Sequence, residues 1–123
     1  MNEKKLTSLL NHLNCSHRDI EIEASEIVTT DGVSKAAALP DDCNEDRVGP
    51  LCAGVFCFAR GVAKAFGMGE VEQIILTAGK SSALINLTDE QTLLAMKIKS
   101  HNDIERLSQA GKCVTEEIGH AMA

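Results

Sequence analysis

The stretch "LCAGVFCFARGVAKAFGMGE", residues 51–70, decides how the rest of the chain is interpreted. Most of it has the composition of a helix, yet Gly54 and Gly61 lie inside it. A glycine within a helix costs about 1 kcal/mol relative to alanine. Together with the polar segment before it, the pattern predicts one long helix from about Glu45 to Phe66, which Gly67 is suited to end. Pro50 fits only the first turn or two of a helix, so a start near Val48 is the alternative.

This helix carries two apolar stripes. Larger residues form one stripe, with the spacing of three and four that packs on a sheet: Val48, Leu51, Cys52, Val55, Phe58, Ala59, Val62 and Phe66. Small residues form the other: Pro50, Ala53, Gly54, Cys57, Gly61 and Ala65. Small side chains let a second backbone approach closely. We therefore expect the small stripe to contact the same helix of a second subunit across a two-fold axis, unless another helix of the same chain covers it.

Periodicity predicts further elements on both sides of the long helix. Before it we expect a short amphipathic helix and two strands, over residues 3–14, 20–30 and 33–39. Asp31-Gly32 is a typical sequence for a hairpin turn. In the first strand, apolar and polar residues alternate from Ile20 to Ser25, which predicts one buried and one solvent-exposed face. The alternation slips around Glu26–Ile27, which indicates a bulge or a twist.

After the long helix, the pattern predicts three strands and a closing helix, over residues 70–78, 82–87, 92–99 and 100–123. Ser100 or Asn102 would cap that last helix. The element order is therefore α-β-β-α-β-β-β-α within a single domain, residues 1–123. Strands and helices segregate, so the fold class is α+β, with one antiparallel sheet and helices on its faces.

Composition narrows the possible functions. The formal net charge of −6 argues against a nucleic-acid or membrane-surface partner. We find no signal-peptide pattern and no apolar run near the length of a membrane span. The five cysteines include no C-x-x-C pair, which indicates reduced thiols in a cytoplasmic protein rather than a disulfide framework or a metal site. No motif calls for a cofactor.

Nearly the whole chain resembles the Roadblock-type domain, the dynein-light-chain Roadblock family with its prokaryotic small-GTPase regulators. The resemblance is carried by Leu6, Leu9, Leu10 and Leu13, by "EASEIVTTDGVSKAAALP", by "FGMGEVEQIILTAGKSSALINL" and by "LLAMKIKSHNDIERLSQAGKCVTEEI". Its most specific part is "GMGEVEQIIL". The resemblance implies a five-stranded antiparallel sheet with the long central helix on one face and the terminal helices on the other, similar to profilin and longin domains.

The resemblance also implies a homodimer in which the central helices pair and the middle strands join. The joining strand would hold Val71 to Thr77. The interface residues expected on this basis are Ala53, Gly54, Cys57, Gly61, Ala65, Val71, Gln73 and Ile75.

Prokaryotic members of the family commonly bind a small Ras-like GTPase, and some act as its activating protein. The resemblance therefore implies a regulatory scaffold without catalysis of its own, with the paired helices as a platform. Arg47, Arg60 and Lys64 would lie near this platform. Arg60 could act as an arginine finger, in which a guanidinium stabilises charge on a transferred phosphoryl group. The resemblance favours another mode of action, because better-known family members reshape the GTPase and do not insert an arginine.

Two alternatives remain open from the residues. The dimer could be a structural adaptor that bridges other proteins without a GTPase. The chain could instead be a small enzyme that uses Cys15, close to His17, or Cys57 as a nucleophile. Neither "GMGEVEQ" nor "GKS" has the context of a phosphate-binding loop, so we expect no nucleotide hydrolysis by the chain itself.

Overall fold

The structure is a computed structural model that describes residues 21–99 and 104–122, together with residues 5, 7, 8, 10 and 11. The helix predicted over residues 3–14 and the predicted caps Ser100 and Asn102 therefore lie wholly or largely outside the described residues. The described elements are β1 (Ile22–Thr29), β2 (Ser34–Ala38), α2 (Glu45–Phe66), β3 (Gln73–Thr77), β4 (Ser81–Asp89), β5 (Thr92–Lys99) and α3 (Ile104–Met122).

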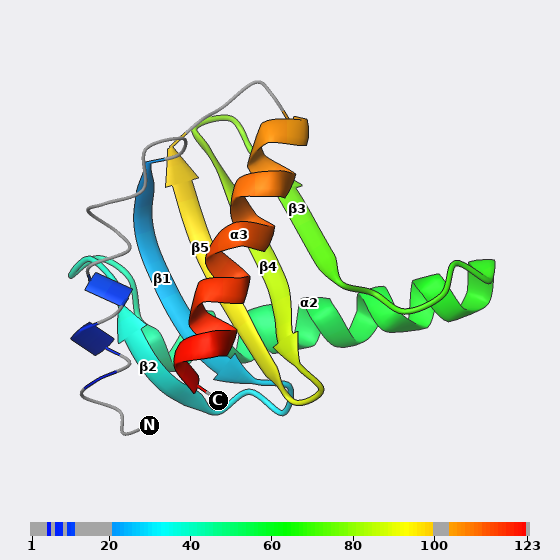
Figure 1. Ribbon diagram of the computed structural model, residues 1–123, viewed down its shortest axis with the longest axis horizontal. Coiled ribbons are helices and arrows are strands. Elements are labelled where there is room, and N and C mark those ends of the chain that lie inside the picture. Colours follow the sequence, from blue (N-terminus) through cyan, green and yellow to red (C-terminus); the bar gives the residue numbers. More distant parts are fainter. Residues whose placement is uncertain (1–4, 6, 9, 12–20, 100–103, 123) are drawn as a thin grey trace.

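The five strands form one antiparallel sheet in the order β2-β1-β5-β4-β3 (Figure 1). The β1–β2 hairpin turns at Asp31-Gly32, where Gly32 has a φ of 95° and its N–H donates to the Thr29 carbonyl oxygen at 2.9 Å. The three later strands, β3, β4 and β5, form a meander. β1 pairs with β5 and so joins the β1–β2 hairpin to this meander. The predicted α+β class with a five-stranded antiparallel sheet is confirmed, and β2 and β3 are the two edges of the sheet.

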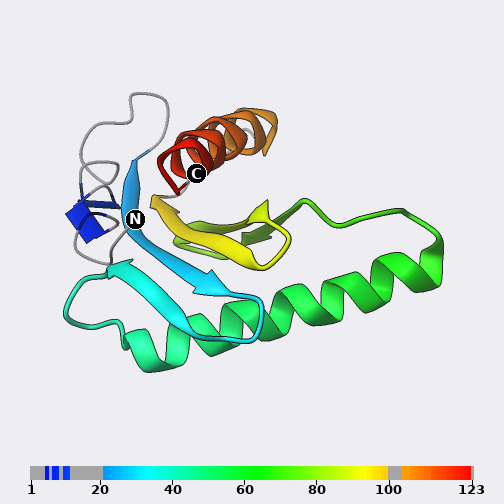
Figure 2. The same ribbon diagram turned by 60° about the horizontal axis from the view of Figure 1, so that its bottom comes forward.

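The two described long helices cover opposite faces of the sheet, α2 on one and α3 on the other (Figure 2). Each face has its own apolar core. On the α3 side the buried residues include Ile27, Leu94, Ile98, Leu107 and Val114. On the α2 side they are Val28, Ala53, Phe56, Ile85, Leu93 and Ala95. Burial of these aliphatic side chains is the main favourable contribution to folding.

β1 is buried on both faces from Ala24 to Val28, so the predicted solvent-exposed face is present at Glu21 and Glu23 and is wrong at Ser25. Ser25 and Glu26 are as buried as the apolar residues beside them. The reason is that the sheet has a cover on each side, which alternation within one strand does not reveal. The predicted irregularity is present, because the register with β2 shifts between Ile27 and Val28.

Local capping fixes the ends of α2 where the sequence predicts them. The Asn44 side chain accepts a hydrogen bond from the Asp46 N–H at 2.9 Å, which satisfies a free amide of the first turn. Gly67 has a φ of 66°, a left-handed conformation that glycine adopts without strain. Its N–H donates to the Lys64 carbonyl oxygen at 3.2 Å and ends the helix.

Polar contacts attach α3 to β3 and β4. The Gln73 Nε2 donates to the Ser108 carbonyl oxygen at 3.1 Å, and the Ser108 hydroxyl donates back to Gln73 Oε1 at 2.6 Å. The Asn86 Nδ2 donates to Thr115 Oγ1 at 2.7 Å. These bonds surround Gly111, where a Cβ would lie 2.8 Å from the buried Leu84 Cδ1 and 3.0 Å from Asn86 Nδ2. The glycine therefore allows α3 to approach the sheet closely.

We expect Gly111→Ala to destabilise the fold by about 1–3 kcal/mol, because the new methyl group overpacks this contact. Gly119→Ala is the matched control in the same helix, since its Cβ would meet only the Thr88 carbonyl oxygen at 4.0 Å. That control should stabilise the fold by up to about 1 kcal/mol through helix propensity. Chemical denaturation of the two variants measures both effects, and equal shifts would contradict the close approach at Gly111.

Candidate functional site

The C-terminal half of α2 extends past the edge of the sheet (Figures 1 and 2). The N-terminal half packs on the sheet through Gly49, Ala53 and Phe56, which are buried. Farther along, Phe58 is 82% exposed and Phe66 is 78% exposed. Leu51, Val55, Val62 and Met68 are exposed large apolar side chains as well. Within the described residues this is an apolar surface with no cover, which typically marks an interaction site.

The sheet contact uses a different side of α2 from the one predicted. Of the stripe expected to face the sheet, Leu51, Val55, Phe58, Val62 and Phe66 are exposed, so the prediction that this stripe is the sheet-packing face is wrong. Phe56 points to the sheet instead and is 1% exposed. Gly49 explains the choice, because a Cβ there would lie 2.7 Å from Glu26 Oε2. Small residues bring α2 close to its own sheet and turn the larger ones outward.

The predicted interface residues of α2 fall into two groups. Ala53 is buried in the core between α2 and the sheet, so its assignment to a subunit interface is wrong. Cys57, Gly61 and Ala65 are exposed and Gly54 is half-buried, and both glycines have open space beside them. Their role in a subunit interface stays a prediction.

β3 is an edge strand with one free side. It pairs only with β4 in this sheet, and it begins at Gln73, three residues after the start of the strand predicted over residues 70–78. The side chains of Gln73 and Ile75 turn toward α3 and its core, while Val71 packs on the α2 side. These three side chains are used inside the subunit. Any pairing with another strand would therefore come from the main chain of β3.

The three predicted partner-facing residues are all exposed on α2. Arg47 lies in the first turn and Lys64 in the last. The Arg60 guanidinium carbon lies 4.7 Å from the centroid of the Phe56 ring, a cation–π contact on the sheet-facing side of the helix. Arg60 would have to leave this ring to act as an arginine finger.

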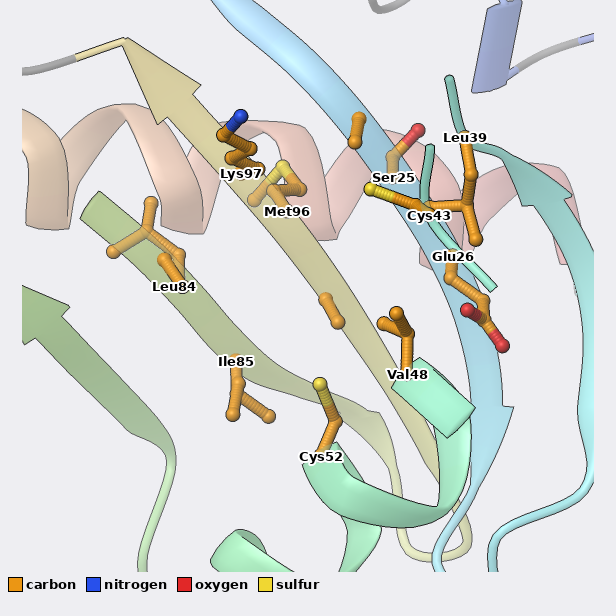
Figure 3. Close-up of a pocket in the computed structure, with 13 residues that line it drawn as sticks. Ser25, Glu26, Leu39, Cys43, Val48, Cys52, Leu84, Ile85, Met96 and Lys97 are labelled. Carbon is orange, nitrogen blue, oxygen red and sulfur yellow. The ribbon is translucent and has the colours of Figure 1, made fainter. Parts of the chain in front are cut away.

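A cavity of about 180 Å³ lies between α2 and the sheet (Figure 3). Its sheet wall includes three alanines from three strands, Ala24 on β1, Ala83 on β4 and Ala95 on β5. Val48 and Cys52 close it on the α2 side. The lining is almost entirely apolar, and this suits an apolar occupant.

Glu26 is the buried charged group at this cavity, and it has 0% exposure. Neither carboxylate oxygen has a hydrogen-bond partner among the described residues. Burial raises the pKa of Glu26 above its ordinary value, and the charges of Glu45 and Asp46 raise it further. The nearby Ser34 hydroxyl lowers the pKa in part, although it donates to Glu45 Oε1 at 3.0 Å. Burial raises the pKa of the Cys52 thiol, and the Glu26 carboxylate raises it further.

The raised pKa of Glu26 predicts a pH-dependent stability. The folded state holds the proton more tightly than the unfolded chain, so this group weakens folding as pH rises from about 4.5 through the folded-state pKa. Each unit of difference between the two states corresponds to about 1.4 kcal/mol. The difference in unfolding free energy, wild type minus Glu26→Gln, should fall with rising pH and then level off. Urea titrations between pH 4 and 8 measure it, and a constant difference would contradict a raised pKa.

The described residues show no further catalytic or metal-binding arrangement. No group of three or more His, Cys, Asp or Glu side chains within them is placed to hold a metal ion. Cys43, Cys52, Cys57 and Cys113 are free thiols. Cys15 and His17, the alternative nucleophile and base, lie outside the described residues.

α2 is, in the part of the chain that the structure describes, the one helix whose length and composition would suffice to cross a membrane. Core helices of soluble proteins pass the same test. The N-terminal half of α2 packs on the sheet through Ala53 and Phe56, which is the position of a core helix.

Sequence comparison gives one family. Residues 12–97 match the model of the Roadblock/LC7 domain family. No curated protein sequence matches the chain.

Solved structures with the same fold include MglB of Myxococcus xanthus, which has a TM-score of 0.80 and 16% identity over 96% of this chain and 94% of that one. A Roadblock/LC7 domain of Streptomyces avermitilis has a TM-score of 0.75 and 17% identity over 100% of both chains. Profilin II of Acanthamoeba castellanii is more distant, with a TM-score of 0.54 and 10% identity over 81% of this chain and 86% of that one. At these identities the likeness concerns the fold alone.

Proposed function

The chain belongs to the Roadblock/LC7 domain family, and on that premise we propose that it is a cytoplasmic regulatory scaffold without catalysis of its own. In this proposal two copies form a homodimer, and the dimer binds a small Ras-like GTPase and modulates its nucleotide cycle or its location. The GTPase is the partner that the sequence resemblance implies.

The observation that carries the dimer is the uncovered apolar half of α2 beside the free edge of β3. Val62 and Phe66 are exposed in the part of α2 that continues past the sheet on the same side of the molecule as β3. Two copies joined through antiparallel β3 strands would form one continuous sheet and bring both α2 helices onto one face. Both exposed features would then be covered at once. A related structure is described as MglB with a tetrameric arrangement, which supports self-assembly in proteins of this fold.

We expect the purified chain to sediment as a dimer, and Val62→Asp to shift it to a monomer, because a buried unpaired charge opposes association. Val33→Asp is the matched control. Val33 is 57% exposed against 53% for Val62, but it lies beside β2 at the opposite edge of the sheet. Analytical ultracentrifugation distinguishes the two, and a monomeric wild type would contradict the dimer.

Gly61→Leu tests the small stripe of α2 separately. Gly61 has open space around it in the subunit, so leucine fits the isolated fold. We predict that the substitution dissociates the dimer if the stripe forms the helix seam. A dimer of unchanged affinity would place the seam on the side of Val62 instead.

The regulatory role predicts binding that depends on the nucleotide. We expect pull-down with a small GTPase to retain more of one state, GTP-loaded or GDP-loaded, and the double variant Arg47→Ala, Lys64→Ala to weaken capture. Lys99→Ala is the control, because Lys99 is an exposed residue at the end of β5 that pairs with Glu21 and is not part of α2. Equal capture of both nucleotide states would favour the adaptor alternative.

Arg60→Ala tests the arginine-finger interpretation. If the chain stimulates GTP hydrolysis by the GTPase, we expect the variant to keep the stimulated rate within a few-fold of the wild-type rate. Loss of a true arginine finger would lower this rate by a factor of about 10³–10⁵.

A further inference from the structure

The cavity beside Cys52 extends from α2 along the sheet, because its lining joins Val48 and Cys52 of the helix to Ala24, Ala83 and Lys97 of the strands. On the sheet face toward α2, residues that pair across neighbouring strands form rows that run across the sheet. The row of Val28, Leu93 and Leu87 packs beneath α2. Two rows farther along the strands, the aligned residues are Ala24, Lys97, Ala83 and Leu76. Leu76 at the β3 end of this row is 46% exposed. The cavity reaches this row, since Ala24, Lys97 and Ala83 are among its lining residues.

The geometry of the proposed dimer places a helix there. Two antiparallel β3 strands are related by a two-fold axis normal to the sheet and midway between them. β1 is three positions from β3, so it lies about 17 Å from this axis at about 4.8 Å per strand. Gly49 sits against β1. At 1.5 Å per residue α2 reaches the axis roughly 11 residues later, near Arg60.

Phe66 then lies about 9 Å beyond the axis, over the sheet of the other subunit. In that sheet, β4 and β5 lie about 7 and 12 Å from the axis. The small residues of the cavity floor, Ala83 and Ala95, belong to these two strands. The two-fold axis keeps both α2 helices on one face of the joined sheet, so the side chain arrives on the cavity side.

The orientation of the side chain agrees with this placement. Phe66 follows Val48 by 18 residues, which is five helical turns, so the two lie on the same side of α2. Val48 lines the cavity from the α2 side. In an antiparallel pair related by this axis, the sides of the helices that carry Val48 and Phe66 face each other. The C-terminal end of the incoming helix also carries partial negative charge and would lie near Lys97.

We propose that the cavity is the receptor for Phe66 of the partner subunit, so that the dimer is held by two reciprocal phenyl insertions. This inference rests on the homodimer proposed above. The volume of about 180 Å³ fits one phenyl ring, since a cavity of about 150 Å³ holds benzene. The almost wholly apolar lining suits such an occupant, and Phe66 has no cover in its own subunit.

The chain contains no Trp or Tyr, so Phe66→Trp introduces its one strong fluorophore. Above the dissociation constant of the dimer, we expect emission at shorter wavelength and weak quenching by iodide. Dilution to monomer should move the emission to longer wavelength and restore quenching. Phe58→Trp is the control, since Phe58 is equally exposed but lies about 200° around the helix from the sheet-facing Phe56. Its emission should not change with dilution.

Phe66→Ala tests the same contact without enlarging the side chain. Phe66 is 78% exposed in the subunit, so the variant folds normally. Each buried phenyl contributes about tenfold to association, so loss of two should raise the dimer dissociation constant about 100-fold. Phe58→Ala should leave it unchanged. Ala83→Met, which fills the cavity from within, should weaken the wild-type dimer but not weaken Phe66→Ala further.

The outcomes separate the two proposals. A wild-type dimer in which Phe66→Ala and Phe58→Ala have equal affinity, with both tryptophans open to iodide, would overturn the phenyl insertion and leave the dimer standing. A wild-type chain that sediments as a monomer at every concentration would overturn both.

Discussion

The close approach of α2 to β1 determines which surfaces this protein offers. Gly49 permits that approach because there is no space for a Cβ against the Glu26 carboxylate. With Gly49 and Ala53 turned to the sheet, Phe56 is the one large α2 side chain in the core on that side. The other bulky residues of α2 must then point away. The exposed apolar surface of the helix is thus a consequence of how tightly its small side is packed.

Much of the fold follows from local sequence chemistry. The Asp31-Gly32 turn and the Gly67 helix end follow directly from local residue preferences, and the described helices and strands are of the types expected. The face of α2 does not follow in the same way. The apolar residues of α2 lie on most sides of the helix. More than one set of them has the three- and four-residue spacing of a buried stripe, so the pattern does not identify the buried side. The contact between Gly49 and Glu26 joins residues far apart in the sequence, and no local pattern contains it.

Glu26 shows a second limit of the sequence. The predicted alternation slips at Glu26–Ile27, so the pattern alone assigns no face to this carboxylate. The structure buries it, without a hydrogen-bond partner among the described residues. The one signal in the sequence is an acidic residue between Ser25 and Ile27 in a strand with many apolar residues. It gains meaning only once the sheet order places β1 between two neighbours.

The length of α2 that extends past the sheet has a consequence for dynamics. The segment from Phe58 to Phe66 continues a helix that is already formed on the sheet, so it needs no new nucleation, but apart from the buried Ala63 it gains little packing within the subunit. It can therefore open from its C-terminal end more readily than the rest of α2 unless another surface covers it. If a second copy is the cover, the amide hydrogens of this segment exchange at a rate set by chain concentration, while those of β5 do not. Assembly and the last step of folding would then be a single event.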